Sequence, residues 1–202
     1  MFGLTGAQLL IAALLLSLTW FLIKILWSHQ ESSTPASPLR RSLTITVDID
    51  AAADRVWKKV VDWERQGEWM FATSVWLAPG SVRHGVGAEI VAYTGPGAKR
   101  ASASNLPLAR IFGGFIDHMV IVQWEPPVRC EVLHVGKVVR GVGVFEVQPL
   151  SDRRARFIWS EVVELPFGYL GALGWPLIAL GTRVAVKFSL NRLASTFKSN
   201  PA

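Results

Sequence analysis

Residues 154–166 read RARFIWSEVVELP and show the pattern of a β-strand. Every second residue belongs to one apolar face, which is typical of a half-buried strand. The members of this face are Phe157, Trp159, Val163 and Leu165, with Glu161 in their middle. A carboxylate that points at an apolar layer is costly unless it is paired, protonated or beside a cavity. Glu161 is therefore either a structural ion-pair member or the polar point of an internal pocket.

The segments around this strand predict an α+β fold with an antiparallel sheet. Alternation of apolar and polar residues predicts further strands at residues 43–49, 75–77, 87–93, 115–124, 130–135 and 143–147. Helical spacing predicts a helix after residue 51, a second short helix beyond Gly67, and a long helix at 175–197 with Pro176 in its first turn. We expect the sheet to cover both apolar stripes of the long helix. One stripe is Val186, Leu190, Leu193 and Phe197, and the other is Leu177, Leu180, Val184 and Phe188.

This order of elements resembles the helix-grip fold of the START-like (SRPBCC) superfamily of polyketide cyclases, lipid-transfer domains and related ligand binders. Three stretches carry the resemblance: residues 45–57 (ITVDIDAAADRVW), 122–129 (VQWEPPVR) and 159–166 (WSEVVELP). The resemblance covers residues 41–198. It implies a curved antiparallel sheet of about six or seven strands wrapped on the long helix, with two short helices after the first strand. It implies a cavity for an apolar molecule, but the fold alone does not give the chemistry.

An apolar segment precedes this domain. Residues 4–27 contain one charge, Lys24, and are long enough to span a bilayer. A cleaved signal peptide is the alternative, but no Lys or Arg precedes the segment and no clear small-x-small cleavage site follows it. We expect a transmembrane anchor at 1–27, a flexible Ser/Pro-rich linker at 28–40, the START-like domain at 41–198 and a tail at 199–202. Because Lys and Arg residues are in excess after the span, the positive-inside rule places the domain in the cytoplasm.

Composition argues against several other functions. The 202 residues carry a formal net charge of +6 without any long basic run, which fits a membrane surface better than nucleic acid as a partner. The single cysteine, Cys130, lies in a predicted strand, and we expect a buried structural thiol. The four histidines show no ligand spacing, and no P-loop, dinucleotide fingerprint or nucleophile elbow occurs. No metal and no cofactor are therefore expected.

Side chains on the inward strand faces are the candidates for a site. We expect a ligand to contact Tyr93, His118, Trp124, His134, Phe145, Trp159 and Glu161. If the strands pair in sequence order, Glu161 meets His134 or Arg140, and such a pair could orient a ligand or act as acid and base. Glu161, His134 and Arg140 are thus the catalytic candidates, against the alternative of an ion pair that only completes the fold. The irregular segment 94–114 is either a lid or a disordered insertion.

Three functions remain open from the sequence. A membrane-anchored protein that binds a hydrophobic small molecule (a lipid, an isoprenoid quinone or a polyketide-like compound) agrees best with the observations. A cyclase, aromatase or dehydratase would need an inward acid–base pair beside an open cavity. A scaffold in a membrane complex would have a filled interior and a large exposed apolar patch. The sequence leaves open whether the protein is an enzyme.

Overall fold

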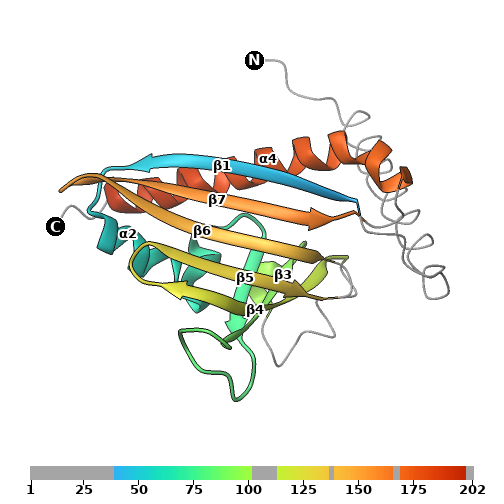
Figure 1. The fold of residues 1–202 in the computed structure, drawn as a ribbon, viewed down its shortest axis with the longest axis horizontal. Coiled ribbons are helices and arrows are strands. Elements are labelled where there is room, and N and C mark those ends of the chain that lie inside the picture. The colour runs from blue at the N-terminus through green and yellow to red at the C-terminus, as the bar shows by residue number, and fades with distance from the viewer. Residues whose placement is uncertain (1–38, 102–112, 137–138, 166–168, 199–202) are drawn as a thin grey trace. The chain divides into compact units, whose positions relative to one another are not determined.

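Seven strands form one curved antiparallel sheet in the computed structural model (Figure 1). Their order across the sheet is β1-β7-β6-β5-β4-β3-β2, so the first strand of the domain pairs with the last. The strands are β1 (Arg40–Ile49), β2 (Thr73–Leu77), β3 (Glu89–Thr94), β4 (Phe115–Glu125), β5 (Arg129–Val135), β6 (Arg140–Ser151) and β7 (Arg154–Glu164). The predicted strand number and antiparallel pairing are confirmed.

The chain divides into two units, Met1–Pro38 and Leu39–Ala202. The structure describes residues 39–101, 113–136, 139–165 and 169–198, which all belong to the second unit. The expected membrane anchor, most of the linker, the middle of segment 94–114 and the C-terminal tail lie outside the described residues. Among the described helices, none is long and apolar enough to cross a bilayer.

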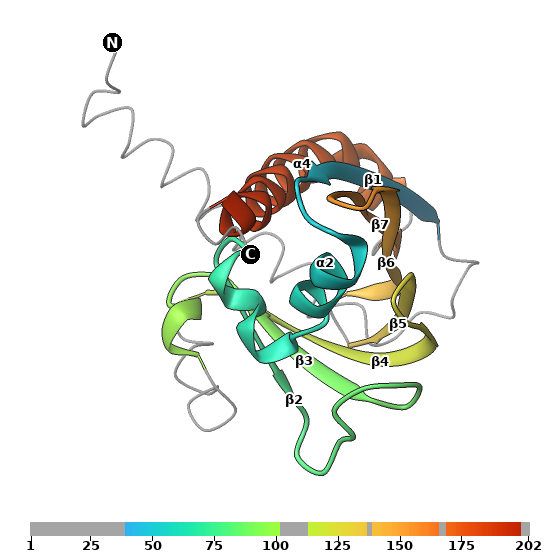
Figure 2. The ribbon, with the colours of Figure 1, turned by 90° about the vertical axis from the view of Figure 1, so that its left-hand side faces the viewer.

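Two α-helices pack against the sheet. Helix α2 (Ala53–Val60) lies within the curve of the sheet and buries Val56, Trp57 and Val60 (Figure 2). Helix α4 (Tyr169–Lys198) runs along the edge strand β1. Short 3-10 helices complete the described fold at η2 (Trp63–Glu68) and η3 (Ala98–Arg100). A curled antiparallel sheet with one long C-terminal helix is the arrangement that the helix-grip resemblance implies.

Glycine and proline account for the wrongly predicted boundaries. Gly67 does not start a new helix but lies inside η2, where a Cβ atom would approach the Thr73 carbonyl oxygen to 3.0 Å. Gly141 lies inside β6, so this strand begins before the predicted residue 143. Its φ of +134° and its closeness to the backbone of Val162 leave no room for a side chain. Pro176 lies inside α4, which begins at Tyr169. A proline removes one helical hydrogen bond without ending the helix, so the predicted start was too late.

Within the described part of the chain, only one of the two apolar stripes of α4 packs against the core. Leu190 and Leu193 are fully buried, and Val186 and Phe197 pack against the same core. The second stripe is exposed to solvent: Leu177 by 78%, Leu180 by 60%, Val184 by 63% and Phe188 by 50%. The expectation that the sheet covers both stripes is therefore wrong. A helix that packs along an edge strand presents only one face to the sheet.

Candidate functional site

Three ionisable side chains meet on the concave face of the sheet. Asp117 comes from β4, His134 from β5 and Glu161 from β7. The Nδ1 atom of His134 lies 2.7 Å from Oδ2 of Asp117, and its Nε2 atom lies 3.0 Å from Oε2 of Glu161. Trp159 donates its indole N–H to Oε1 of Glu161 over 2.6 Å. One imidazole thus joins two carboxylates, and an indole holds the outer one in place.

Strand register explains how these groups meet across β6. His134 is opposite Gly141 of β6, and Glu161 is opposite Gly143 of the same strand. A Cβ atom on Gly143 would lie 3.0 Å from Nε2 of His134 and 3.1 Å from Oε1 of Glu161. Because β6 has glycine here, the imidazole can reach over it from β5 to β7.

The cluster is charged and largely shielded from water. Asp117 and His134 are each 7% exposed, while the Glu161 side chain is 18% exposed. Burial by itself lowers the pKa of His134, but hydrogen bonds to Asp117 and Glu161 and their negative charges outweigh it and raise that pKa to about 10. At neutral pH the ring is an imidazolium that donates both N–H groups. The imidazolium thus lies between the carboxyl groups of Asp117 and Glu161.

One acceptor of the cluster lacks a partner. The Oδ1 atom of Asp117 is buried and has no hydrogen bond within the described part of the chain. A buried acceptor without a donor costs about 1–3 kcal/mol. Because this atom is shielded from solvent, the part of the cluster that a ligand can reach is the carboxyl group of Glu161, whose side chain is 18% exposed.

The concave face is sealed at one end and half open at the other. At the sealed end, Ala155 and Phe157 of β7 and Val147 of β6 are 0% exposed. Two residues further along β7 the side chains become half-buried, and this continues through Trp159, Glu161 and Val163. The ionisable cluster lies at this half-open end, where β5 and β7 end and where α4 begins (Figure 1).

Four of the predicted ligand contacts come together on the concave face: His134, Phe145, Trp159 and Glu161. The rings of Phe145 and Trp159 lie 5.1 Å apart, beside the cluster. Of the two partners expected for Glu161, the structure has His134. Asp117 was not among the predicted residues, although it alternates with Met119 and Ile121 as Glu161 alternates with its apolar neighbours.

Three predicted residues lie elsewhere. Tyr93 pairs with Ile116 on the convex face, in a second apolar cluster, and its hydroxyl donates to the Pro96 carbonyl oxygen over 2.8 Å. His118 is exposed on that same convex face. Arg140 is largely exposed and lies 3.5 Å from Glu164, not beside Glu161. Side chains alternate along a strand, so each of these residues faces away from the cluster.

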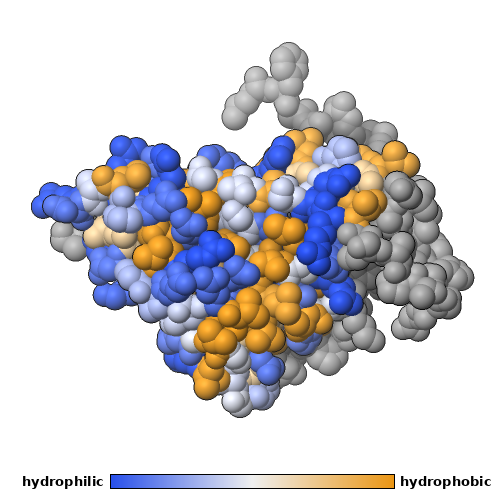
Figure 3. All heavy atoms as spheres, in the orientation of Figure 1, coloured by the Kyte–Doolittle hydropathy of each residue, from blue (hydrophilic) through white to orange (hydrophobic). Residues whose placement is uncertain are grey.

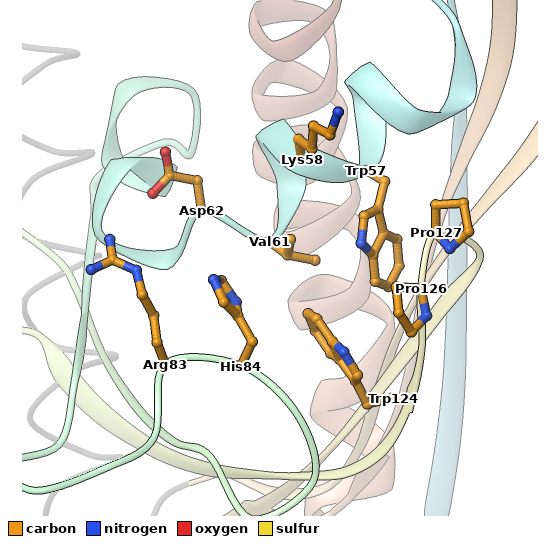
Figure 4. A pocket seen from close by; sticks show the side chains of 9 residues that line it. All are labelled: Trp57, Lys58, Val61, Asp62, Arg83, His84, Trp124, Pro126 and Pro127. Carbon is orange, nitrogen blue, oxygen red and sulfur yellow. The ribbon is translucent and has the colours of Figure 1, made fainter.

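Trp124 lies on the concave face but at the opposite end from the cluster. A β-bulge between Ile121 and Gln123 shifts the alternation, so Trp124 does not share a face with His118 as expected. It lines an open cleft of about 590 Å³ between α2, the β2–β3 loop and the β4–β5 turn (Figure 4). There its ring lies 5.2 Å from Trp57 and 5.7 Å from His84. The cleft has a mainly apolar lining and is separate from the ionisable cluster.

Cys130 is buried in β5 as predicted, and burial raises the pKa of its thiol to about 12. Within the described ranges, no three His, Cys, Asp or Glu side chains are arranged to hold a metal ion. Both ring nitrogens of His134 are already engaged by carboxylates.

Solved structures share the whole architecture. A protein of Thermus thermophilus aligns over 80% of this chain and 100% of its own, with a TM-score of 0.59 and 14% identity. The Zhui aromatase/cyclase of a Streptomyces species aligns over 81% of this chain and 98% of its own, with a TM-score of 0.58 and 12% identity. This is the helix-grip fold. Norcoclaurine synthase of Thalictrum flavum has it too, over 81% of this chain and 99% of its own, with a TM-score of 0.55 and 13% identity.

Sequence comparison adds nothing to this structural likeness. No family model matches the chain, and no curated protein matches it. At such low identity the similarity shows the fold alone, and function has to be argued from the chain's own site.

Proposed function

We propose that this protein is a membrane-anchored binder of a neutral, hydrophobic small molecule. The ligand lies on the concave face with the Asp117–His134–Glu161 cluster as its polar contact. One observation carries the proposal: a buried, hydrogen-bonded ionic cluster stands at the half-open end of an otherwise apolar face. Ligand sites are commonly apolar hollows with a few convergent polar groups.

The lining around the cluster suits an apolar ligand. The half-buried side chains beside it are Met119, Val132, Phe145, Trp159 and Val163. Since these side chains remain partly accessible, a bound molecule would remove apolar surface from water and gain about 25 cal/mol for each Å².

The hydrogen bonds and charges of the cluster limit which chemical groups a ligand can have. Both N–H groups of His134 are used by carboxylates, so no donor of the imidazolium is left for a carbonyl group. The two carboxyl groups of the cluster disfavour a carboxylate or phosphate group on the ligand, whereas the partly exposed carboxyl group of Glu161 can accept a hydrogen bond from a ligand hydroxyl. We therefore favour a hydroxyl-bearing lipid, a polyketide-like phenol or the reduced, hydroquinone form of an isoprenoid quinone.

Membrane anchoring through residues 4–27 forms part of this proposal. The apolar segment places the binding domain beside a bilayer, which is the store of such ligands in a cell. The domain is proposed to lie on the cytoplasmic side. Protease treatment of inverted and of right-side-out vesicles tests this, and digestion of the domain only in right-side-out vesicles would contradict it.

Mass spectrometry of organic extracts tests ligand binding. The full chain, purified natively in a mild detergent, should release a reproducible hydroxyl-bearing hydrophobic compound. Glu161→Gln should lose most of that compound, because the cluster loses a charge and its hold on His134. Glu164→Gln is the matched control, since Glu164 lies on the opposite face of the same strand beside Arg40. An extract without any such compound, or equal retention in both variants, would contradict the proposal.

A cyclase-like or dehydratase-like enzyme is the second candidate. It is favoured by the His134–Glu161 contact of 3.0 Å on the concave face and by two helix-grip neighbours that are named as aromatase/cyclases. The raised pKa of His134 opposes its use as a general base, because an imidazolium cannot accept a proton at neutral pH, and leaves it only the role of a general acid. Conversion of the extracted compound on incubation with the chain, abolished in Glu161→Gln, would establish this function in place of simple binding.

A further inference from the structure

Helix α4 presents an apolar stripe from Leu173 to Phe188 that the described part of the chain leaves largely uncovered. At its end, the ring of Phe188 packs edge-on against that of Phe71 at 5.5 Å, and Phe71 is itself 52% exposed. Exposure along this stripe is 79% at Leu173, 78% at Leu177, 60% at Leu180, 63% at Val184 and 50% at Phe188. Successive members are three or four residues apart, so they share one face of the helix. The stripe is an ordered surface and not a scatter of single exposed residues. Figure 3 shows hydrophobic side chains gathered at the end of the domain where α4 begins.

The first part of α4 has the composition of a helix that lies at the surface of a lipid bilayer. Residues 169–182 contain no charged side chain, and Arg183 and Lys187 follow as the first exposed charges. At 1.5 Å per residue this uncharged part is about 21 Å long. An apolar stretch of that length is too short to span a bilayer but suits a helix that lies at its surface. Long basic side chains next to it can extend toward lipid headgroups.

The place of the stripe in the fold connects it to the N-terminal segment. The backbone N–H of Leu165 donates to the carbonyl oxygen of Leu39 over 2.7 Å, and α4 begins four residues after Leu165. The chain therefore enters the domain at the end where α4 begins. The linker residues 28–38 precede this point and span at most about 40 Å when fully extended. An anchor at residues 4–27 would keep this end of the domain close to the bilayer.

Basic side chains at the same end add an electrostatic contribution. The side chain of Arg40 at the start of β1 is 65% exposed, and that of Arg140 at the start of β6 is 71% exposed. Both lie beside the one carboxyl group of Glu164, at 3.0 Å and 3.5 Å. Arg183 and Lys187 are exposed on α4 itself. Basic side chains close to an anionic bilayer are attracted to its surface.

We propose that the stripe formed by Leu173, Leu177, Leu180, Val184 and Phe188 inserts into the interfacial layer of an anionic lipid bilayer. The occupant of this surface is lipid and not a second protein chain. Because α4 begins at the half-open end of the concave face, this insertion would bring that end near the bilayer. A hydrophobic ligand could then pass between membrane and site with little exposure to water. Of the proposed function, this inference requires the membrane anchor but not the binding of a ligand.

Site-directed spin labelling of the full chain tests the proposal. Cys130 is buried and its thiol has a raised pKa, so an introduced cysteine is the reactive thiol of the described domain. Leu177→Cys places a label in the stripe. Asn191→Cys is the matched control, because Asn191 is exposed about four helical turns later on the same face of α4. Both are reconstituted in vesicles of phosphatidylcholine and phosphatidylglycerol, and collisions with oxygen and with a water-soluble nickel chelate are compared.

We expect the label at 177 to collide at least several-fold more with oxygen than with the chelate, and the label at 191 to show the reverse. Equal accessibility of both labels to the chelate would overturn the proposal. Shielding of the label at 177 from both reagents would overturn it in favour of a protein partner, including a second copy. Flotation of the vesicles distinguishes failure of the membrane anchor from failure of the proposed insertion of α4. Chain left in the aqueous fraction would overturn both anchor and inference, whereas floating chain with a water-exposed label would overturn the inference alone.

Discussion

Replacement of Gly143 by alanine probes the cluster through a single methyl group. The new Cβ atom would lie 3.0 Å from Nε2 of His134, 3.0 Å from Cγ2 of Val132 and 3.1 Å from Oε1 of Glu161. Favourable contacts between such atoms occur at about 3.5–4.0 Å, so the neighbours must move by a few tenths of an ångström. The hydrogen bond between His134 and Glu161 would therefore lengthen.

The expected cost follows from two opposing effects. Overpacking of a filled site destabilises by about 1–3 kcal/mol. Replacement of glycine lowers the conformational entropy of the unfolded chain, which stabilises the folded state by about 0.4–1 kcal/mol. We expect a net loss on the order of 1–2 kcal/mol in the free energy of unfolding, and a lower pKa of His134 because its contact with Glu161 is weakened.

Urea unfolding at pH 7 and NMR titration of the His134 ring measure the two effects. Gly181→Ala is the matched control, since a Cβ atom there meets nothing within 4 Å. In the interior of a helix that change should stabilise by about 0.5–1 kcal/mol. If Gly143→Ala raised stability as the control does and left the titration of His134 unchanged, the steric reasoning would be refuted.

Three further predictions follow from burial and charge. The pKa of His134 is raised from 6.5 to about 10, so its contribution to the free energy of unfolding is complete below pH 6.5 and is lost as pH rises through 10. The urea concentration at the midpoint of unfolding should therefore fall between pH 7 and pH 10, and a midpoint that does not change over this range would contradict the prediction. Cys130 should react with a thiol reagent only in urea, because burial raises the pKa of the thiol to about 12, and rapid labelling of the folded chain would disprove its burial. Phe157→Ala should cost about 3–5 kcal/mol in urea unfolding, because Phe157 is fully buried and packs on Phe145, and a loss below about 1 kcal/mol would show that the sealed end is loosely packed.

Alternation within single strands was the most informative pattern in the sequence. It placed Glu161 on the concave face and His134 on the same face, and strand order then brought the two within hydrogen-bond distance. Asp117 shows the same anomaly as Glu161, a carboxylate among alternating apolar residues, and could have been predicted on the same ground. Period-2 patterns are reliable here because side chains must alternate between the two faces.

Features that depend on contacts between distant segments could not be predicted. The β-bulge between Ile121 and Gln123 reverses the parity of β4, and no local pattern marks it. The glycines of β6 resemble turn residues, and only their closeness to β7 and to the ionic cluster explains them. The exposed stripe of α4 has the same composition as the buried one. Its exposure follows from the helix's position on the sheet edge and not from its residues.

The unequal sealing of the concave face has a consequence for motion. Amides around Phe157 and Val147 should exchange with solvent only through global unfolding, because both residues belong to the buried core. Amides of β5 and β7 near Glu161 should exchange faster, through partial opening, because fewer apolar contacts hold that end closed. Such a domain can bind and release a ligand through partial opening of the end near Glu161, while its aromatic core stays folded.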